Sequence, residues 1–272
     1  MPNGVRTAIQ RAMSLVARLS RDPRLATEAW RKLRSRLSTH RDVATSCAQR
    51  AVSADEALAI VLGTDLPTIR AHMNSPSLSA ILIELENYEP PVEEMGGAAY
   101  LELCYAVIRI MRPSVIIETG VGYGYSTAAI LQALQDNASG HLHSVDLPAF
   151  RPGTLAHIGA AVPPALRESG RWDLRLGPDR RLLPPLLEEL DVVDVFFYDS
   201  DKTYDGMLGS WGLAWPKLRS GGLLVADDVH LHSALFDFAA AYGLTPSIVA
   251  KPSGRGVYRS NRIFYQGILR KP

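Results

Sequence analysis

Short apolar runs alternate with amphipathic segments along the chain from residue 97 onward. Runs rich in Val, Ile and aromatic residues predict strands, and apolar residues at helical spacing predict the helices between them. The predicted strands cover residues 115–118, 141–145, 172–176, 192–198, 222–226, 245–249 and 262–266. Helices are predicted near residues 97–111, 127–135, 154–161, 182–190, 204–215 and 233–242.

This alternation predicts the α/β fold class, with a mostly parallel, doubly wound sheet of seven strands that carries helices on both faces. Only a loop rich in Gly, Pro and Ser, residues 251–260, separates the last two strands. A short loop cannot make a parallel crossover, so the last strand is expected to be antiparallel. In such sheets ligands bind beyond the carboxyl ends of the strands.

The first 50 residues differ in charge from the rest of the chain. They hold ten Arg and one Lys against three acidic residues, a net charge of +8 in a chain whose total is +1. Two basic amphipathic helices are predicted there, and a further helix near residues 54–62. We therefore expect a basic helical extension over residues 1–75 and an α/β domain over residues 76–272. The basic segment favours a packing arm on the acidic domain or on a second subunit, as in a homodimer. A weak membrane-surface contact through residues 1–40 and an organellar transit peptide stay open.

Composition narrows the class of protein. The chain has 272 residues, 47% of them apolar, with no apolar run long enough for a membrane span and no secretory signal pattern. Two cysteines are too few for a disulfide framework or a zinc site, which favours a cytoplasmic location. The basic segment lacks the aromatic residues that interleave with basic ones on nucleic-acid surfaces, so no nucleic-acid partner is expected.

The loop after the first strand of the α/β domain is the most informative motif. Gly120, Gly122 and Gly124 occupy every second position there, Glu118 precedes them at the strand end, and Ser126 opens the next helix. Glycines let backbone N–H groups approach a ligand, and the helix N-terminus adds a positive dipole end. The spacing differs from the dinucleotide pattern, and an acid beside the loop suits a cationic ligand such as S-adenosylmethionine. A tight structural turn is the alternative.

The ends of the following strands carry acidic residues. Asp146 ends the second strand, where an acid can accept hydrogen bonds from ribose hydroxyls, although a turn cap would look the same. Asp179 lies in a polar turn after the third strand, at the expected place of an adenine edge. Asp199, Asp227 and Asp228 end the next two strands, and such like charges are costly together unless a cation binds them. Their oxygen ligands suit Mg²⁺ or Mn²⁺ better than zinc, unless one or two of them merely cap helices.

Taken in order, these motifs resemble class I S-adenosylmethionine-dependent methyltransferases, in particular the metal-dependent small-molecule O-methyltransferases. The resemblance covers residues 95–230 and is carried by the glycine loop, Asp146, Gly177-Pro, Asp199-x-Asp201-Lys202 and Asp227-Asp228. The Asp-x-Asp-Lys segment is similar to the catechol and caffeoyl-CoA branch, and the Asp-Asp pair to macrocin-type sugar O-methyltransferases. The resemblance implies a Rossmann-like fold, a Mg²⁺ ion on Asp199, Asp227 and Asp228, and a cofactor site that includes Asp199.

The implied reaction is methyl transfer from S-adenosylmethionine to a hydroxyl of a small molecule, a vicinal diol of a sugar or a catechol-type natural product. The resemblance implies Lys202 or Asp201 as the base, and His230 is the base if no metal takes part. A nicotinamide-dependent oxidoreductase would need a wider glycine spacing. A binding or scaffold protein on a methyltransferase fold is the second hypothesis.

Overall fold

A mixed eight-stranded sheet forms the centre of the protein in a computed structural model that describes residues 43–90, 95, 97–147 and 154–272. The strand order is β1-β7-β8-β6-β5-β2-β3-β4. The strands are β1 (Ala51–Val52), β2 (Val115–Thr119), β3 (His141–Asp146), β4 (Trp172–Leu176), β5 (Val193–Tyr198), β6 (Leu218–Ala226), β7 (Ser247–Ala250) and β8 (Tyr265–Arg270). All neighbouring pairs are parallel except those of β8, which runs antiparallel to β6 and to β7, as predicted.

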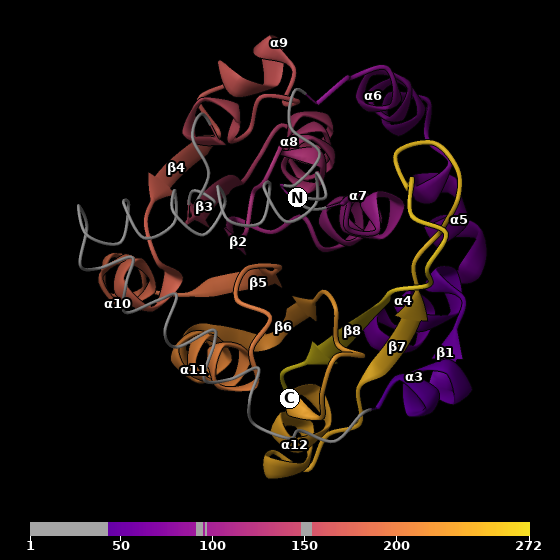
Figure 1. Ribbon diagram of the computed structural model, residues 1–272, viewed down its shortest axis with the longest axis vertical. Helices are drawn as coiled ribbons and strands as arrows, with labels where there is room; N and C mark the ends of the chain where they lie inside the picture. Colours follow the sequence, from indigo (N-terminus) through magenta and orange to yellow (C-terminus); the bar gives the residue numbers. More distant parts are fainter. Residues whose placement is uncertain (1–42, 91–94, 96, 148–153) are drawn as a thin grey trace, which may run out of the picture.

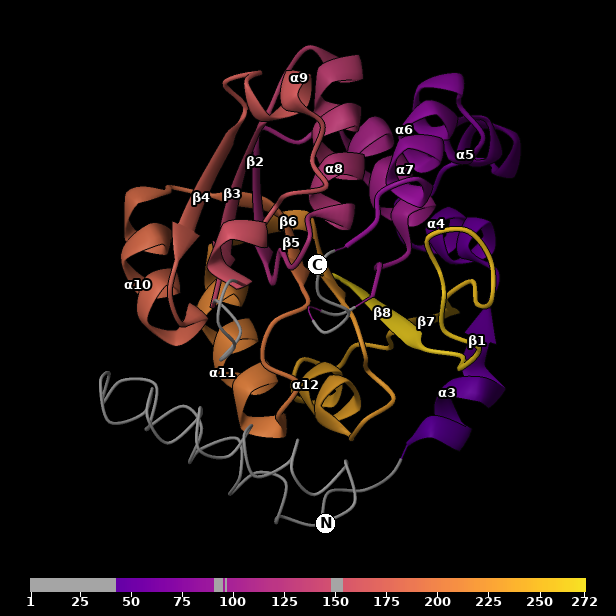
Figure 2. The same ribbon diagram turned by 45° about the horizontal axis from the view of Figure 1, so that its top comes forward.

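Helices cover both faces of this sheet (Figures 1 and 2). One face carries α4 (Ala54–Leu62), α5 (Leu66–Met73), α6 (Pro76–Glu86), α7 (Leu101–Met111), α8 (Tyr125–Asn137) and α9 (Pro164–Arg167). The other carries α3 (Ala44–Arg50), α10 (Asp179–Glu189), α11 (Tyr204–Ala214) and α12 (Ala234–Ala241). Two 3₁₀ turns, η1 (Thr154–His157) and η2 (Trp215–Lys217), complete the described elements.

Alternation along the strands divides the core between these two layers. Ile116 and Val195 belong to the cluster under α4–α9, whereas their neighbours Ile117 and Phe196 belong to the cluster under α3 and α10–α12. Successive side chains of a strand point to opposite faces, so an unbroken apolar strand has to be covered on both sides. The apolar runs seen in the sequence are therefore explained by burial in two layers.

The segment before residue 75 takes part in the same core. β1 pairs in parallel with β7, and Leu58 and Ile69, from α4 and α5, are fully buried in the first cluster. Serine and aspartate caps set the helix starts here, since Ser53 accepts from the Glu56 N–H and Asp65 from the Thr68 N–H. The boundary at residue 75 stays a prediction as a domain division. The predicted basic helices of residues 1–40 lie outside the described residues.

The last strand lies further along the chain than predicted. The expected range of 262–266 ends before Gly267, yet β8 continues through this glycine to Arg270 and pairs Gly267 with Ala226. A Cβ at Gly267 would lie 2.1 Å from Cδ2 of Leu235, so the glycine makes room for α12 against the sheet.

Within the described residues, no helix is both long and apolar enough to cross a membrane.

Candidate active site

The glycine loop between β2 and α8 forms one wall of a cavity of about 860 Å³ at the carboxyl ends of the strands. Gly120 has φ of +86°, and a Cβ on it would lie 2.3 Å from the carbonyl oxygen of Asp199. Gly124 has φ of +93°, and its Cβ would lie 2.6 Å from Cγ2 of Val162. Glycine is thus required twice, for a left-handed backbone and for close approach. Gly120, Gly122 and Ser126 line the cavity, whereas Gly124 packs behind it.

Asp146 ends β3 on the wall of the same cavity. Its Oδ2 accepts hydrogen bonds from the backbone N–H groups of Val121 at 2.6 Å and Gly122 at 2.7 Å. Charge-assisted bonds of this kind fix the glycine loop beside the carboxylate. Asp146 therefore lies where the sequence predicts a ribose acceptor, and it also shapes the loop.

Glu118 is buried beside the glycine loop. Its carboxylate is buried and accepts hydrogen bonds from Ser126 Oγ at 2.6 Å, Thr127 Oγ1 at 2.8 Å and Ser144 Oγ at 2.8 Å. Burial raises the pKa of Glu118, although the three hydroxyl groups oppose this rise. Glu118 is not part of the main cavity wall and instead joins β2, β3 and the first turn of α8. A direct cofactor contact by Glu118 stays a prediction.

Asp179 begins α10 and is also buried at the cavity wall. Its Oδ2 accepts from Ser200 Oγ at 2.7 Å and from Ser210 Oγ at 3.1 Å, and its Oδ1 accepts from the Arg180 N–H. These bonds join α10 to the loop after β5 and to α11. Asp179 lies near the loop residues that the sequence assigns to the cofactor, and its side chain is held in place.

The three aspartates after β5 and β6 meet at another part of the cavity wall. Asp199, Asp227 and Asp228 each offer a carboxylate oxygen, and these atoms all lie within 4.8 Å of one another. Two lysines share the cluster. Lys202 Nζ contacts Asp199 and lies 3.3 Å from Oδ2 of Asp228, and Lys251 Nζ lies 2.6 Å from Oδ2 of Asp227. Three carboxyl groups thus face two ammonium groups in a largely buried site.

Burial and mutual charge change the pKa values in this cluster. Burial raises the pKa of Asp199 well above its usual range, against the opposing effect of the Lys202 ammonium, and the charges of Asp227 and Asp228 add to the rise. Burial also opposes the charge of Asp228, yet the ammonium groups of Lys202 and Lys251 lower its pKa. The pKa of Lys202 is raised, because its attraction to Asp199 and Asp228 exceeds the effect of burial. Lys202 is therefore protonated at neutral pH.

Comparison with known proteins identifies the type of domain to which this site belongs. Residues 117–229 match the family model of a methyltransferase domain, a range that contains the glycine loop and all three aspartates. This part of the chain is a methyltransferase domain. The resemblance to class I S-adenosylmethionine-dependent methyltransferases is thereby confirmed. Among curated proteins no match is found.

Solved structures show the same fold over most of the chain. The O-methyltransferase TomG from Streptomyces achromogenes, involved in tomaymycin synthesis and solved with SAM, superposes with a TM-score of 0.52 at 16% identity over 73% of this chain and 91% of TomG. An O-methyltransferase from Bacillus cereus in complex with SAH gives a TM-score of 0.51 at 14% identity, over 83% of this chain and 100% of its own. The likeness supports the predicted Rossmann-like fold, with β1 as an additional eighth strand.

The aspartate cluster of the methyltransferase has the donor chemistry of a divalent-cation site. Oδ1 of Asp227 and Oδ1 of Asp228 are both buried, and neither has a hydrogen-bond partner. Unpaired buried carboxylate oxygens are costly unless a cation binds them. Asp228 also has φ of +56°, a left-handed conformation that is uncommon outside glycine and is concentrated at functional sites. The residues therefore fit Mg²⁺ or Mn²⁺, as the sequence predicts.

The three candidate bases differ in whether they line the cavity. Lys202 and Asp201 line the cavity, and Asp201 is buried, with Oδ1 accepting from the Thr203 N–H at 3.1 Å at the start of α11. His230 does not line it and contacts the rings of Phe264 and Tyr265 edge-on. Burial lowers the pKa of His230, so its imidazole is neutral at pH 7. Lys202 and Asp201 are thus the candidates with access to an acceptor.

Sequence reasoning did not identify Lys251 or the aromatic part of the cavity wall. Lys251 is buried, with its ammonium 5.2 Å from the centre of the Phe264 ring. Tyr123, Tyr125 and Tyr258 also line the cavity, and the rings of Tyr123 and Tyr125 lie 6.2 Å apart. Pro90, Met95 and several residues of the 251–260 loop also contribute to the wall. The pairing of Lys251 with Asp227 joins residues 24 positions apart, and no local pattern signals it.

Proposed function

We propose that the protein transfers a methyl group from S-adenosylmethionine to a hydroxyl group of a small acceptor that carries two neighbouring oxygen atoms, with Mg²⁺ or Mn²⁺ as the metal. The observation that carries the proposal is one cavity with two walls of different chemistry. One wall is the glycine loop with Asp146, and the other is the cluster of three aspartates and two lysines. A cavity of about 860 Å³ can hold a cofactor together with a small acceptor, since sites for single ligands start at about 300 Å³.

The loop wall supports S-adenosylmethionine as the methyl donor. Its sulfonium supplies the methyl group, and the carboxylates of Asp146 and Asp179 provide hydrogen-bond acceptors on the cavity wall for a ribose and an amino-purine edge. The fold shared with TomG, which was solved with SAM, points the same way. The bonds from Asp146 to the loop hold this wall in place before a ligand arrives, which lowers the entropy that binding has to overcome.

The aspartate wall supports transfer to an oxygen. Asp199, Asp227 and Asp228 would hold the cation, which when bound lowers the pKa of a hydroxyl group. Lys202 is one candidate base, but Asp199 and Asp228 keep it protonated, so it could accept the proton of the hydroxyl group only after these contacts weaken and it has released its own proton to water. Asp201 is the second candidate base in the same wall.

The aromatic residues of the wall favour a flat acceptor of the catechol type over a sugar. Tyr123, Tyr125, Tyr258 and Phe264 line the cavity, and such side chains offer flat apolar surface with few hydrogen-bonding groups. A sugar ring would leave most of its hydroxyl groups without partners against this surface. We expect catechols and flavonoids to be methylated faster than glycosides.

The test is methyl transfer from radiolabelled S-adenosylmethionine to a panel of catechols, flavonoids and glycosides, with EDTA and after addition of Mg²⁺. We expect activity to be lost in EDTA and restored by Mg²⁺, and Asp199→Asn and Asp228→Asn to be inactive though folded. Asp205→Asn is the matched control, because Asp205 is exposed in the first turn of α11 and lies outside the cavity wall. Full activity in excess EDTA would refute the metal, and cofactor binding without turnover of any acceptor would favour the scaffold hypothesis.

A further inference from the structure

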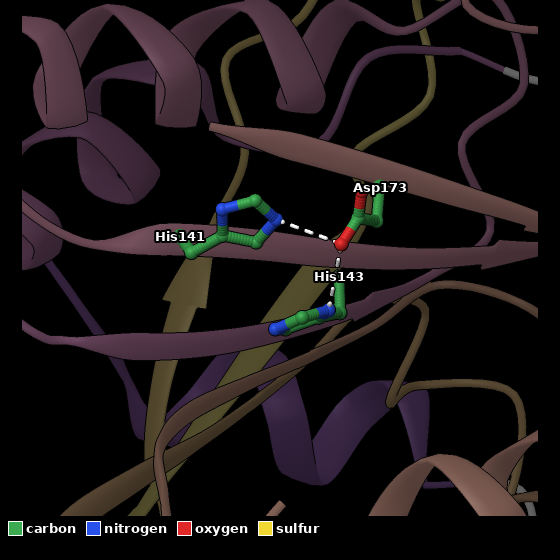
Figure 3. A group of neighbouring side chains, drawn as sticks. All are labelled: His141, His143 and Asp173. Atoms are coloured by element: carbon green, nitrogen blue, oxygen red, sulfur yellow. Dashed lines mark hydrogen bonds and ion pairs between the residues drawn. The ribbon is translucent and has the colours of Figure 1, made fainter. Parts of the chain in front are cut away.

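A group of metal-ligating side chains lies at the far edge of the sheet, apart from the cavity. His141 and His143 belong to β3, and Asp173 belongs to β4, which is the last strand at that edge. Residues two apart in a strand point to the same face, and His143 pairs directly with Asp173 in the strand register. Figure 3 shows both imidazole rings turned toward one carboxylate oxygen of Asp173.

The distances within this group suit a small transition-metal ion. Nε2 of His141 lies 2.9 Å from Oδ2 of Asp173, and Nδ1 of His143 lies 3.5 Å from the same oxygen. All three atoms lie within 4.8 Å of one another. Ligands at the usual zinc bond lengths of about 2.0–2.2 Å are separated by about 3.3 Å in a tetrahedral site. The two nitrogen–oxygen separations, 2.9 and 3.5 Å, lie on either side of this value, and the two nitrogens are close enough for side-chain rotation to bring all three atoms around one ion.

A hydrogen-bonded pair of His141 and Asp173 explains only part of this arrangement. Nδ1 of His143 is buried and has no hydrogen-bond partner, although the ring faces the carboxylate. Buried polar atoms without partners are rare in folded proteins, and a metal ion is one explanation of them.

The surroundings allow an ion to enter and to keep a water ligand. The side chain of Asp173 is 59% exposed and that of His141 is 33% exposed. Arg175 follows Asp173 on the same face of β4, but Glu189 neutralises it through a hydrogen bond of 3.0 Å. The local charge therefore does not oppose a cation. Asp146, which belongs to the cofactor wall, lies at the other end of β3.

We propose that His141, His143 and Asp173 form a structural site for a divalent transition cation of the Zn²⁺ class, with water as the fourth ligand. Two nitrogens and one carboxylate oxygen are ligands that zinc accepts, whereas the oxygen-only aspartate cluster suits Mg²⁺. The ion ties the edge strand β4 to β3, so that it stabilises the fold and takes no part in methyl transfer.

The test is a titration of the full, tag-free chain with Zn²⁺ against a chromophoric chelator, together with visible spectra of the Co²⁺-loaded protein. The variants are His141→Gln and Asp173→Asn, whose side chains are partly exposed and lie outside the buried core. Two control variants test whether Zn²⁺ binds elsewhere on the protein. His157→Gln removes a histidine outside the cluster, and Asp228→Asn removes a carboxylate of the aspartate cluster.

We expect one equivalent of Zn²⁺ whose affinity falls at least tenfold in His141→Gln and in Asp173→Asn and is unchanged in both controls. Zn²⁺ should also raise the melting temperature of the wild type and of His157→Gln, but not that of His141→Gln. The proposal is overturned if no Zn²⁺ binds at micromolar concentration. Equal binding by the wild type, His141→Gln and Asp173→Asn would overturn it as well.

Discussion

Replacing Glu118 distinguishes a structural carboxylate from a cofactor ligand. Three hydroxyl groups donate to it, at 2.6, 2.8 and 2.8 Å. Hydrogen bonds to a charged group contribute about 1.5–3 kcal/mol each, and the burial of Glu118 offsets part of that sum. Glu118→Gln keeps the shape and one acceptor oxygen, so we expect a loss of about 1–2 kcal/mol in the free energy of unfolding. Glu118→Ala also leaves a cavity, and we expect about 3–5 kcal/mol.

The assay is urea unfolding of both variants, combined with calorimetry of S-adenosylmethionine binding at a temperature where each variant is folded. Glu84→Gln is the control, because Glu84 is exposed on α6. If the carboxylate only joins β2, β3 and α8, stability falls while the cofactor affinity of the folded Gln variant changes little. A Gln variant of unchanged stability with a tenfold weaker affinity would refute this reasoning and restore Glu118 as a direct ligand.

The pH dependence gives the same experiment a second readout. The pKa of Glu118 is raised in the folded protein, so between its ordinary value and the raised value the folded state binds more protons than the unfolded state. The contribution of this group to stability therefore falls as pH rises through that window. Glutamine does not titrate, so we expect the stability advantage of the wild type over Glu118→Gln to be greatest in mild acid and to shrink as the pH is raised.

Three further changes test the cavity walls. Asp146→Ala should weaken S-adenosylmethionine binding by about 1–3 kcal/mol in calorimetry, the scale for lost bonds to a charged group, and an unchanged affinity would exclude Asp146 from the site. Gly124→Ala should lower the free energy of unfolding by more than about 1 kcal/mol, because φ is +93° and Val162 lies 2.6 Å from the new Cβ; an unchanged melting curve would contradict this. Lys251→Met removes an ammonium that competes for Asp227, so Mn²⁺ should bind more tightly by calorimetry, and weaker binding would refute the competition.

The sequence predicts the central strands well because their signal is local. The predicted bounds of β4 agree with the observed ones, and those of β2, β3 and β5 differ by a single residue at one end. β2 and β5 are buried apolar runs between polar loops, and the edge strand β4 alternates apolar with polar residues. β1 has only two residues and pairs with β7, almost 200 positions later, so it has no periodicity to detect. Gly267 resembles a strand end, and only the neighbouring Leu235 explains why the strand passes through it.

The sequence also predicts that a residue faces the cavity, but only where its position at the end of a strand is sufficient to determine this. Asp146 is the last residue of β3, and Asp199, Asp227 and Asp228 directly follow β5 and β6; the fold brings such positions to one edge. Glu118 stands at a strand end too, but its environment depends on Ser144 of β3 and on the first turn of α8. A single strand and its loop cannot reveal that three hydroxyl groups take up the carboxylate.

The charge balance of the aspartate wall shows what tertiary contacts add to a motif. From the sequence, three converging carboxylates imply a cation, because like charges do not gather without compensation. The fold supplies part of that compensation itself, with Lys202 beside Asp199 and Asp228 and with Lys251 beside Asp227. One carboxyl group more than the number of ammonium groups remains, and two buried carboxylate oxygens have no hydrogen-bond partner. A divalent cation would therefore have to displace at least one ammonium to reach Asp227 or Asp199, and the two lysines set the affinity of the metal site as much as the three aspartates do.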